Sequence, residues 1–126
     1  MAFEQTGELD LLIKQGADWE LSMEFTDDAG NVITLTGYKA WIHIRPSAEG
    51  PLLDELKSTG ASPDIVITGA SGLVVATLTY DETAALPPGK HKWELVLSDG
   101  GTPEIRSTQL EGDCVVSAAV VRGTLS

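Results

Sequence analysis

Apolar and polar residues alternate along several short stretches of this chain, and each stretch ends at a cluster of glycine, proline, asparagine or aspartate. A period of two places successive side chains on opposite faces of a β-strand. The alternation is cleanest over residues 19–25, where large apolar side chains face one way and glutamates and a serine face the other. Short strands that recur about every ten residues are typical of a sandwich, so we expect an all-β fold, an immunoglobulin-like antiparallel β-sandwich of about 7–9 strands.

Two turns should produce hairpins, because their residues tolerate left-handed backbone angles. One is the acidic Gly-Asn turn at 27–31, which returns the chain through residues 32–35, and the other is the Ser-Asp-Gly-Gly turn at 98–101. Two weaker strand candidates, 52–57 and 65–68, cannot be paired from the sequence. The remaining strands are expected over residues 9–15, 38–45, 73–80, 91–97, 105–110 and 113–121.

One helical signal interrupts this pattern. Thr79 and Glu82 have the spacing of a capping box, in which each side chain satisfies a backbone N–H of the other residue. Two prolines and a glycine at 87–89 then stop the helix. One short helix is therefore expected near residues 80–86.

The length of 126 residues indicates one domain, since it leaves no room for two well-buried cores. Residues 1–8 carry no sustained pattern and are expected to form a flexible N-terminal arm. A single β-sandwich domain should span residues 9–121, and a polar C-terminal tail should follow at 122–126.

The charge of the chain disfavours two classes of partner. Nineteen acidic and eight basic residues give a formal net charge of −11, which repels phosphate backbones and anionic lipid surfaces. We therefore expect no nucleic-acid binding and no membrane association, and no stretch approaches the roughly 18 apolar residues of a membrane span. The first residues lack the features of a secretion signal, which predicts a protein made in a cytoplasm and not exported by that route. The same charge could complement a basic partner surface.

The histidine, carboxylate and cysteine side chains do not form a pattern typical of catalysis. His43 and His91 each lie within an expected strand without a second ligand at metal spacing. The acidic turn at 27–31 lacks the ligand series of a calcium loop, and the acid pair at 81–82 suits a helix start. Cys114, the only cysteine, lies in an apolar strand and is expected to be buried. We therefore predict a protein that is not an enzyme and has no metal or cofactor.

Trp41 is the aromatic residue that suggests binding. It shares one face of its expected strand with His43 and Arg45, while the opposite face is apolar. On a solvent-facing surface Trp41 could anchor a protein partner or stack against a sugar ring, whereas a half-buried tryptophan under a loop would need no function. Trp19 and Trp93 fall on apolar faces and are expected in the core.

Five segments carry a resemblance to a known family, and they cover most of the chain. They are GELDL (7–11), WEL (19–21), DAGNVITLTGY (28–38), IHIR (42–45) and ETAALPPG (82–89). In order and spacing they resemble the N-terminal β-sandwich of baseplate upper proteins of siphophages, among small tail-region proteins of bacteriophages and prophages. The resemblance implies a virion structural protein of the tail, baseplate, neck or head, assembled in the host bacterial cytoplasm. Its expected partners are other virion proteins and copies of itself, and no functional residue is carried over.

A physical argument accompanies this resemblance. An arm bearing Phe3, or a β-prone C-terminal run, could add a strand to the sheet edge of a neighbour. We therefore expect residues 1–8 or 121–126 to become ordered on assembly. The candidate partner-binding residues are Phe3, Trp41, His43 and Arg45.

Three alternatives remain open at the level of the sequence. A carbohydrate-binding or adhesin-like module would use Trp41, and Tyr38 with it, as a platform for a host-surface glycan. An enzyme would need two converging carboxylates with raised pKa values. A small acidic inhibitor of host defence would imitate nucleic-acid charge, although the acidic residues here are spread through turns and outward strand positions.

Overall fold

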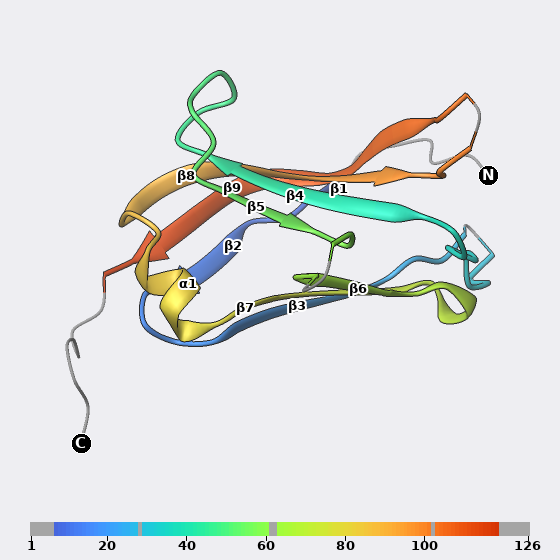
Figure 1. Cartoon of the computed structure of the whole chain (residues 1–126), viewed down its shortest axis with the longest axis horizontal. Coiled ribbons are helices and arrows are strands. Elements are labelled where there is room, and N and C mark those ends of the chain that lie inside the picture. Colours follow the sequence, from blue (N-terminus) through green and yellow to red (C-terminus); the bar gives the residue numbers. More distant parts are fainter. Residues whose placement is uncertain (1–6, 28, 61–62, 102, 119–126) are drawn as a thin grey trace.

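Two β-sheets pack face to face, which confirms the all-β sandwich predicted from the alternation (Figure 1). The computed structural model describes residues 7–27, 29–60, 63–101 and 103–118. The large sheet contains β1 (Gly7–Glu8), β2 (Leu11–Lys14), β4 (Lys39–Arg45), β5 (Asp54–Lys57), β8 (Gly89–Ser98) and β9 (Arg106–Ser117). The small sheet contains β3 (Trp19–Glu24), β6 (Ile65–Thr68) and β7 (Leu73–Leu78).

The strand order places β9, β8 and β4 at the centre of the large sheet. Its order is β1-β9-β8-β4-β5, with β2 also beside β9, and the order of the small sheet is β3-β7-β6. The two weaker strand candidates of the sequence therefore belong to different sheets, since β5 pairs with β4 and β6 pairs with β7.

The N-terminal edge of the large sheet differs from the antiparallel prediction. Both β1 and β2 run parallel to β9 and follow one another along the same side of it. Leu9 and Asp10 separate them, so the strand predicted over 9–15 is interrupted. Gly7 and Glu8, which the sequence assigns to the flexible arm, instead pair with β9 and satisfy its outer backbone groups.

The C-terminal strand is continuous where the sequence predicts two strands, 105–110 and 113–121. The ladder between β8 and β9 runs through Gly112, which lies opposite Trp93, and a β-bulge at Gln109 absorbs one extra residue. The predicted antiparallel hairpin of β8 and β9 is confirmed. The predicted C-terminal tail lies outside the described residues.

The acidic turn produces less pairing than a hairpin. Thr26 and Val32 form an isolated bridge across it, but residues 32–35 do not continue as a strand. Leu35 donates its backbone N–H to the carbonyl of Gly69 at 2.8 Å, and its side chain is fully buried. The chain therefore closes one end of the core instead of extending a sheet.

Inward-facing side chains of both sheets form one apolar core. The three inward residues of β4 are at most 1% exposed, as the alternation predicts. Trp93 and Cys114 are buried as predicted, whereas Trp19 is half-buried on the edge strand β3. Burial of Cys114 raises the pKa of its thiol to about 11.

The predicted short helix is confirmed as α1 (Tyr80–Ala84), and a 3-10 turn, η1 (Gly69–Ser71), joins β6 to β7. Both hydrogen bonds of the capping box between Thr79 and Glu82 are present. The buried hydroxyl of Thr83 accepts from the N–H of Gly16 at 3.0 Å and ties α1 to the turn before β3. Within the described part of the chain, no helix is long and apolar enough to cross a membrane.

Candidate functional site: a charged pocket on the outer face of the large sheet

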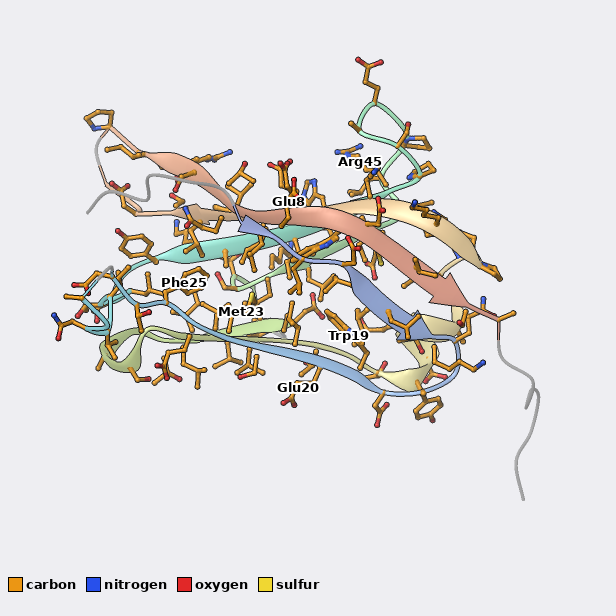
Figure 2. The ribbon with its side chains drawn as sticks, turned by 180° about the vertical axis from the view of Figure 1, so that it is seen from behind. Glu8, Trp19, Glu20, Met23, Phe25 and Arg45 are labelled. Carbon is orange, nitrogen blue, oxygen red and sulfur yellow. The ribbon has the colours of Figure 1, made fainter. Side chains whose placement is uncertain are left out.

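The outer face of the large sheet is polar because its strands alternate. In β4 the inward residues fill the core, so Trp41, His43 and Arg45 project outward together. Figure 2 shows Arg45 and Glu8 on this face and Glu20 on the opposite, outer face of the small sheet. Three of the four candidate partner-binding residues therefore share one surface, and the fourth, Phe3, lies outside the described residues.

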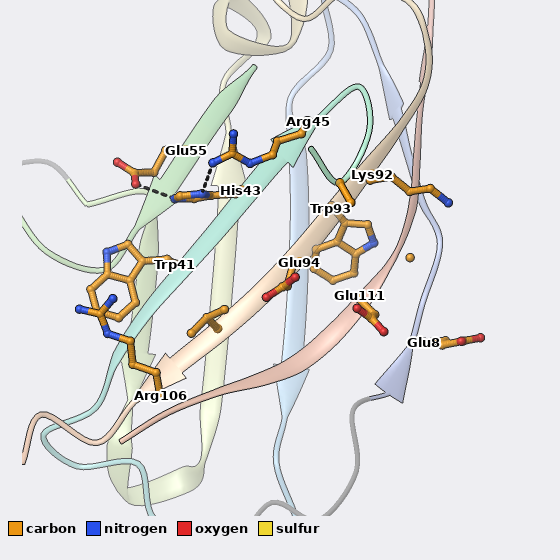
Figure 3. A pocket seen from close by; sticks show the side chains of 13 residues that line it. Glu8, Trp41, His43, Arg45, Glu55, Lys92, Trp93, Glu94, Arg106 and Glu111 are labelled. Carbon is orange, nitrogen blue, oxygen red and sulfur yellow. Dashed lines mark hydrogen bonds and ion pairs between the residues drawn. The ribbon is translucent and has the colours of Figure 1, made fainter. Parts of the chain in front are cut away.

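These outward side chains border a pocket of about 620 Å³ (Figure 3). Its floor comes from outward residues of β4, β5, β8 and β9, with Glu8 of β1 at the far edge. Ala48, in the loop between β4 and β5, contributes to one wall. That loop rises above the sheet in Figure 1, so the pocket lies beside a raised border.

His43 is held by residues on both sides of its ring. Its Nε2 lies 2.7 Å from a carboxylate oxygen of Glu55, and its Nδ1 lies 3.5 Å from a guanidinium nitrogen of Arg45 (Figure 3). A guanidinium can only donate and a carboxylate can only accept, so this arrangement suits a ring that accepts at Nδ1 and donates from Nε2 to Glu55. Arg45 also donates to the carbonyl of Gly50 at 2.9 Å, which fixes the raised loop against the sheet.

Trp41 and Arg106 form a stacked pair at the other side of the pocket. The guanidinium carbon of Arg106 lies 5.1 Å from the centre of the Trp41 ring, within the range of a cation–π contact. Arg106 also donates to Glu104 at 2.6 Å, and the hydroxyl of Ser98 donates to the other oxygen of Glu104 at 2.6 Å. The Ser98 and Arg106 hydrogen bonds lower the pKa of Glu104. Trp41 is half-buried, so the pair is a partly exposed aromatic and cationic anchor.

Carboxylates occupy a row that crosses the sheet between these two sides. The register places Glu94 opposite His43, Glu111 opposite Glu94, and Glu8 opposite Glu111. Like charges directly opposite each other in a sheet are unfavourable, with cross-strand pairs worth roughly 0.2–1 kcal/mol. Three consecutive glutamates on adjacent strands therefore cost folding free energy, and only Glu94 has a hydrogen-bond donor among the described side chains, the hydroxyl of Thr108 at 2.7 Å.

The nearby lysine does not neutralise this row. Lys92 forms an ion pair with Asp113, which also pairs with Lys90 at 3.2 Å. The hydrogen bond to Asp113 raises the pKa of Lys92, and the same bond lowers the pKa of Asp113. Lys92 is therefore paired with Asp113, the residue opposite it in the sheet, and not with a glutamate of the row.

The geometry suits binding by stacking, ion pairing and hydrogen bonding. No group of three or more histidine, cysteine, aspartate or glutamate side chains in the described residues is arranged to hold a metal ion. The second histidine, His91, lies inside the core with its Nε2 2.7 Å from the carbonyl of Pro87, away from the pocket.

Sequence reasoning missed most of the residues that complete the site. The alternation over the expected strand 91–97 does predict that Glu94 is exposed. The alignment of Glu94 with Glu111 and Glu8 depends on register across three strands, and a bulge at Gln109 changes that register. Arg106 was likewise not recognised as a partner of Trp41.

The comparisons with known proteins add no relative: no protein-family model matches this chain, and no curated protein matches its sequence.

Proposed function

We propose that this protein is a non-enzymatic structural module of a phage virion that acts through protein–protein interfaces in the tail, baseplate, neck or head. The phage setting rests on the resemblance of five sequence segments to the sandwich of baseplate upper proteins. Other virion proteins and copies of this chain are the proposed partners, and the virion, assembled in the host bacterial cytoplasm, is the proposed location.

The observation that carries an interface role is the stacked pair of Trp41 and Arg106 on the pocket rim. Tryptophan and arginine are enriched among the residues that dominate protein–protein binding energy. Here they stand on a rigid β-sheet, so little side-chain freedom would be lost when a partner covers them.

Exposed sheet edges support the same role. β5 and β2 are edges of the large sheet, and β3 and β6 are edges of the small sheet. An edge strand offers unpaired backbone groups to an added strand. Of the two segments expected to become ordered on assembly, 1–8 and 121–126, residues 7 and 8 already pair with β9, and residues 1–6 and 121–126 lie outside the described chain.

The location is tested on particles purified from a strain that produces this protein. Quantitative mass spectrometry would measure its copy number relative to a major virion protein, and immunogold labelling would locate it. We expect stoichiometric presence at one position on the particle. A protein missing from purified particles would overturn the structural role.

The interface is tested by particle incorporation of an Arg106→Ala variant. Arg106 is exposed, so its removal should leave the fold intact while taking away the stacked cation. Lys90→Ala is the matched control, since it removes one exposed, ion-paired cation from the internal strand β8, outside the pocket lining. Reduced incorporation of Arg106→Ala alone is the expected result, and equal incorporation of both variants would contradict it.

A carbohydrate-binding or adhesin-like module is the second candidate, and one observation favours it. The half-buried ring of Trp41 lies in a pocket that also carries carboxylates and His43, a combination suited to stacking and hydrogen bonding with a host-surface glycan. Titration with glycans should then quench tryptophan fluorescence in the wild type and not in a Trp41→Phe variant. Equal quenching in both proteins would exclude Trp41 as the platform.

A further inference from the structure

We propose that the outer face of the large sheet docks a basic, extended segment of another virion protein, with lysine or arginine side chains placed among Glu8, Glu94 and Glu111. This inference rests on the proposed function and names the chemistry of the partner at the pocket already described.

The charges around the row point to a cationic occupant. Glu111 and Glu8 have no ion pair or side-chain hydrogen bond within the described residues. Three cations border the pocket: Lys92 pairs with Asp113, Arg106 pairs with Glu104, and Arg45 donates to the carbonyl of Gly50 and lies against His43, so none of them pairs with the row. The face is therefore left with uncompensated negative charge that a basic segment would complement.

Repulsion between the glutamates of this row also destabilises the free protein. Glutamates at directly opposite positions on adjacent strands repel, and a lysine at Glu111 would pair with both neighbours. An unfavourable local arrangement of charges is typical of a functional surface. A bound ammonium or guanidinium group would turn this repulsion into attraction.

The shape of the pocket suits an extended chain that crosses the strands. Neighbouring strands lie about 4.8 Å apart, so the four steps from β5 to β1 span about 19 Å, the length of five to six extended residues. Trp41 stands along one side of this path, and Arg45 with the raised loop stands along the other (Figure 3). The chain of the partner would thus pass between two borders over a carboxylate floor.

Charge argues against a second copy of this chain on the same face. The chain carries a net charge of −11 with only eight lysines and arginines, so two such surfaces repel each other. We therefore propose that copies of this chain contact each other through the sheet edges, and that the acidic row binds a different, basic protein.

The probe for this surface is a synthetic hexapeptide of alternating lysine and threonine with blocked ends, titrated into isotope-labelled protein at low salt. We expect NMR shifts at the Trp41 indole and at the backbone amides of Glu94 and Glu111, and binding that weakens as salt is raised. The same peptide with glutamate in place of lysine should cause no shifts. Shifts centred on the small sheet, or none at about 1 mM lysine peptide, would overturn the proposal.

Two matched variants separate a specific surface from general acidity. The double variant Glu94→Gln/Glu111→Gln removes two charges from the row, and Glu20→Gln/Glu24→Gln removes two charges from exposed positions of β3. We expect about tenfold weaker binding in the first and unchanged binding in the second. Equal weakening in both would contradict the proposal, and thermal unfolding would verify that both variants stay folded.

Failure of this inference is distinct from failure of the proposed function. Suppose that the protein is present in particles, but its Glu94→Gln/Glu111→Gln variant binds the lysine peptide as tightly as the wild type. That result would overturn the docking surface alone. Suppose instead that the protein is missing from particles, but the same variant loses peptide binding. That result would overturn the virion role, while the preference of this face for a basic segment would stand.

Discussion

The indole Nε1 of Trp93 donates a hydrogen bond of 2.7 Å to the backbone carbonyl of Leu9, across 84 residues of sequence. This contact joins the centre of β8 to the point where the N-terminal edge breaks into β1 and β2. Gly112 of β9 lies between them in the sheet, opposite Trp93. The floor of the pocket therefore depends on a buried tryptophan and a glycine that let the parallel edge lie against β9.

Replacing Trp93 by phenylalanine should lower the free energy of unfolding by about 2 kcal/mol, because it removes the donor to Leu9 and part of a ring that is only 2% exposed. Urea denaturation followed by circular dichroism would measure the change. Trp19→Phe is the control, since Trp19 is half-buried and its indole nitrogen has no hydrogen-bond partner among the described residues, and it should cost less than about 1 kcal/mol. Equal losses would show that the Leu9 contact contributes little.

A Gly112→Ala variant should be destabilised by about 2 kcal/mol or more. A β-carbon at this position would overlap the backbone carbonyl of Leu9, and the backbone cannot move without breaking the parallel edge. Gly101→Ala is the comparison, because the new β-carbon would lie 3.3 Å from a carboxylate oxygen of Asp99, a much smaller overlap than the one with the carbonyl of Leu9. Thermal melts of the two variants would distinguish a backbone clash from a general intolerance of glycine replacement.

The thiol of Cys114 should be almost unreactive in the folded protein. Its pKa is about 11, so only about 0.1% is thiolate at pH 8, compared with about 10% for a thiol at the ordinary value of 9.0. Reaction with a disulfide reagent such as DTNB should therefore be at least about a hundredfold slower in buffer than in denaturant. Equal rates under the two conditions would mean that the strand around Cys114 opens readily.

An Asp54→Asn variant should be more stable than the wild type at neutral pH. Desolvation by burial, with smaller repulsion from Glu82 and Asp64, raises the pKa of Asp54. A raised pKa means that the folded state favours the protonated form, so this contribution is present below the unfolded pKa and is lost as pH rises through the folded value. The gain in melting temperature should therefore be seen at pH 7 and should disappear at about pH 3.

Asp113→Asn is the matched control for this pH dependence, since it changes the net charge by the same amount. The Lys92 hydrogen bond lowers the pKa of Asp113, so this carboxylate stabilises the fold above its unfolded pKa and the stabilisation is lost on acidification. The variant should therefore melt at a lower temperature than the wild type at pH 7. Stabilisation by both variants would instead indicate that net charge alone sets the pH dependence.

Local features of the chain are sufficient to predict several elements of this fold. A period of two in polarity identifies β3, β4 and β8 and sorts the side chains of each strand into inward and outward sets. The capping box at Thr79 and Glu82 locates α1, because both of its hydrogen bonds form within four residues. These predictions succeed because the decisive interactions lie within one strand or one turn.

Other features of the fold depend on contacts between segments far apart in the sequence, and local patterns do not predict them. The break at Leu9 and Asp10 depends on the passage of Gly112 and Trp93 beside it, more than eighty residues away in the chain. The bulge at Gln109 shifts half of β9 relative to β8, and alternation within β9 cannot reveal it. Register and strand order are set by packing and hydrogen bonds between segments, so they are not encoded in any local pattern.

The candidate site divides in the same way. Sequence by itself determined that this is an acidic, all-β chain with a core and that Trp41, His43 and Arg45 share the polar face of one strand, because alternation acts within a strand. Only the tertiary structure decided that Arg106 stacks on Trp41 and that Glu8, Glu94 and Glu111 line up across three strands beside them. Charges from separate strands become neighbours only when the sheet sets their register, and that register creates the surface for which we propose a basic partner.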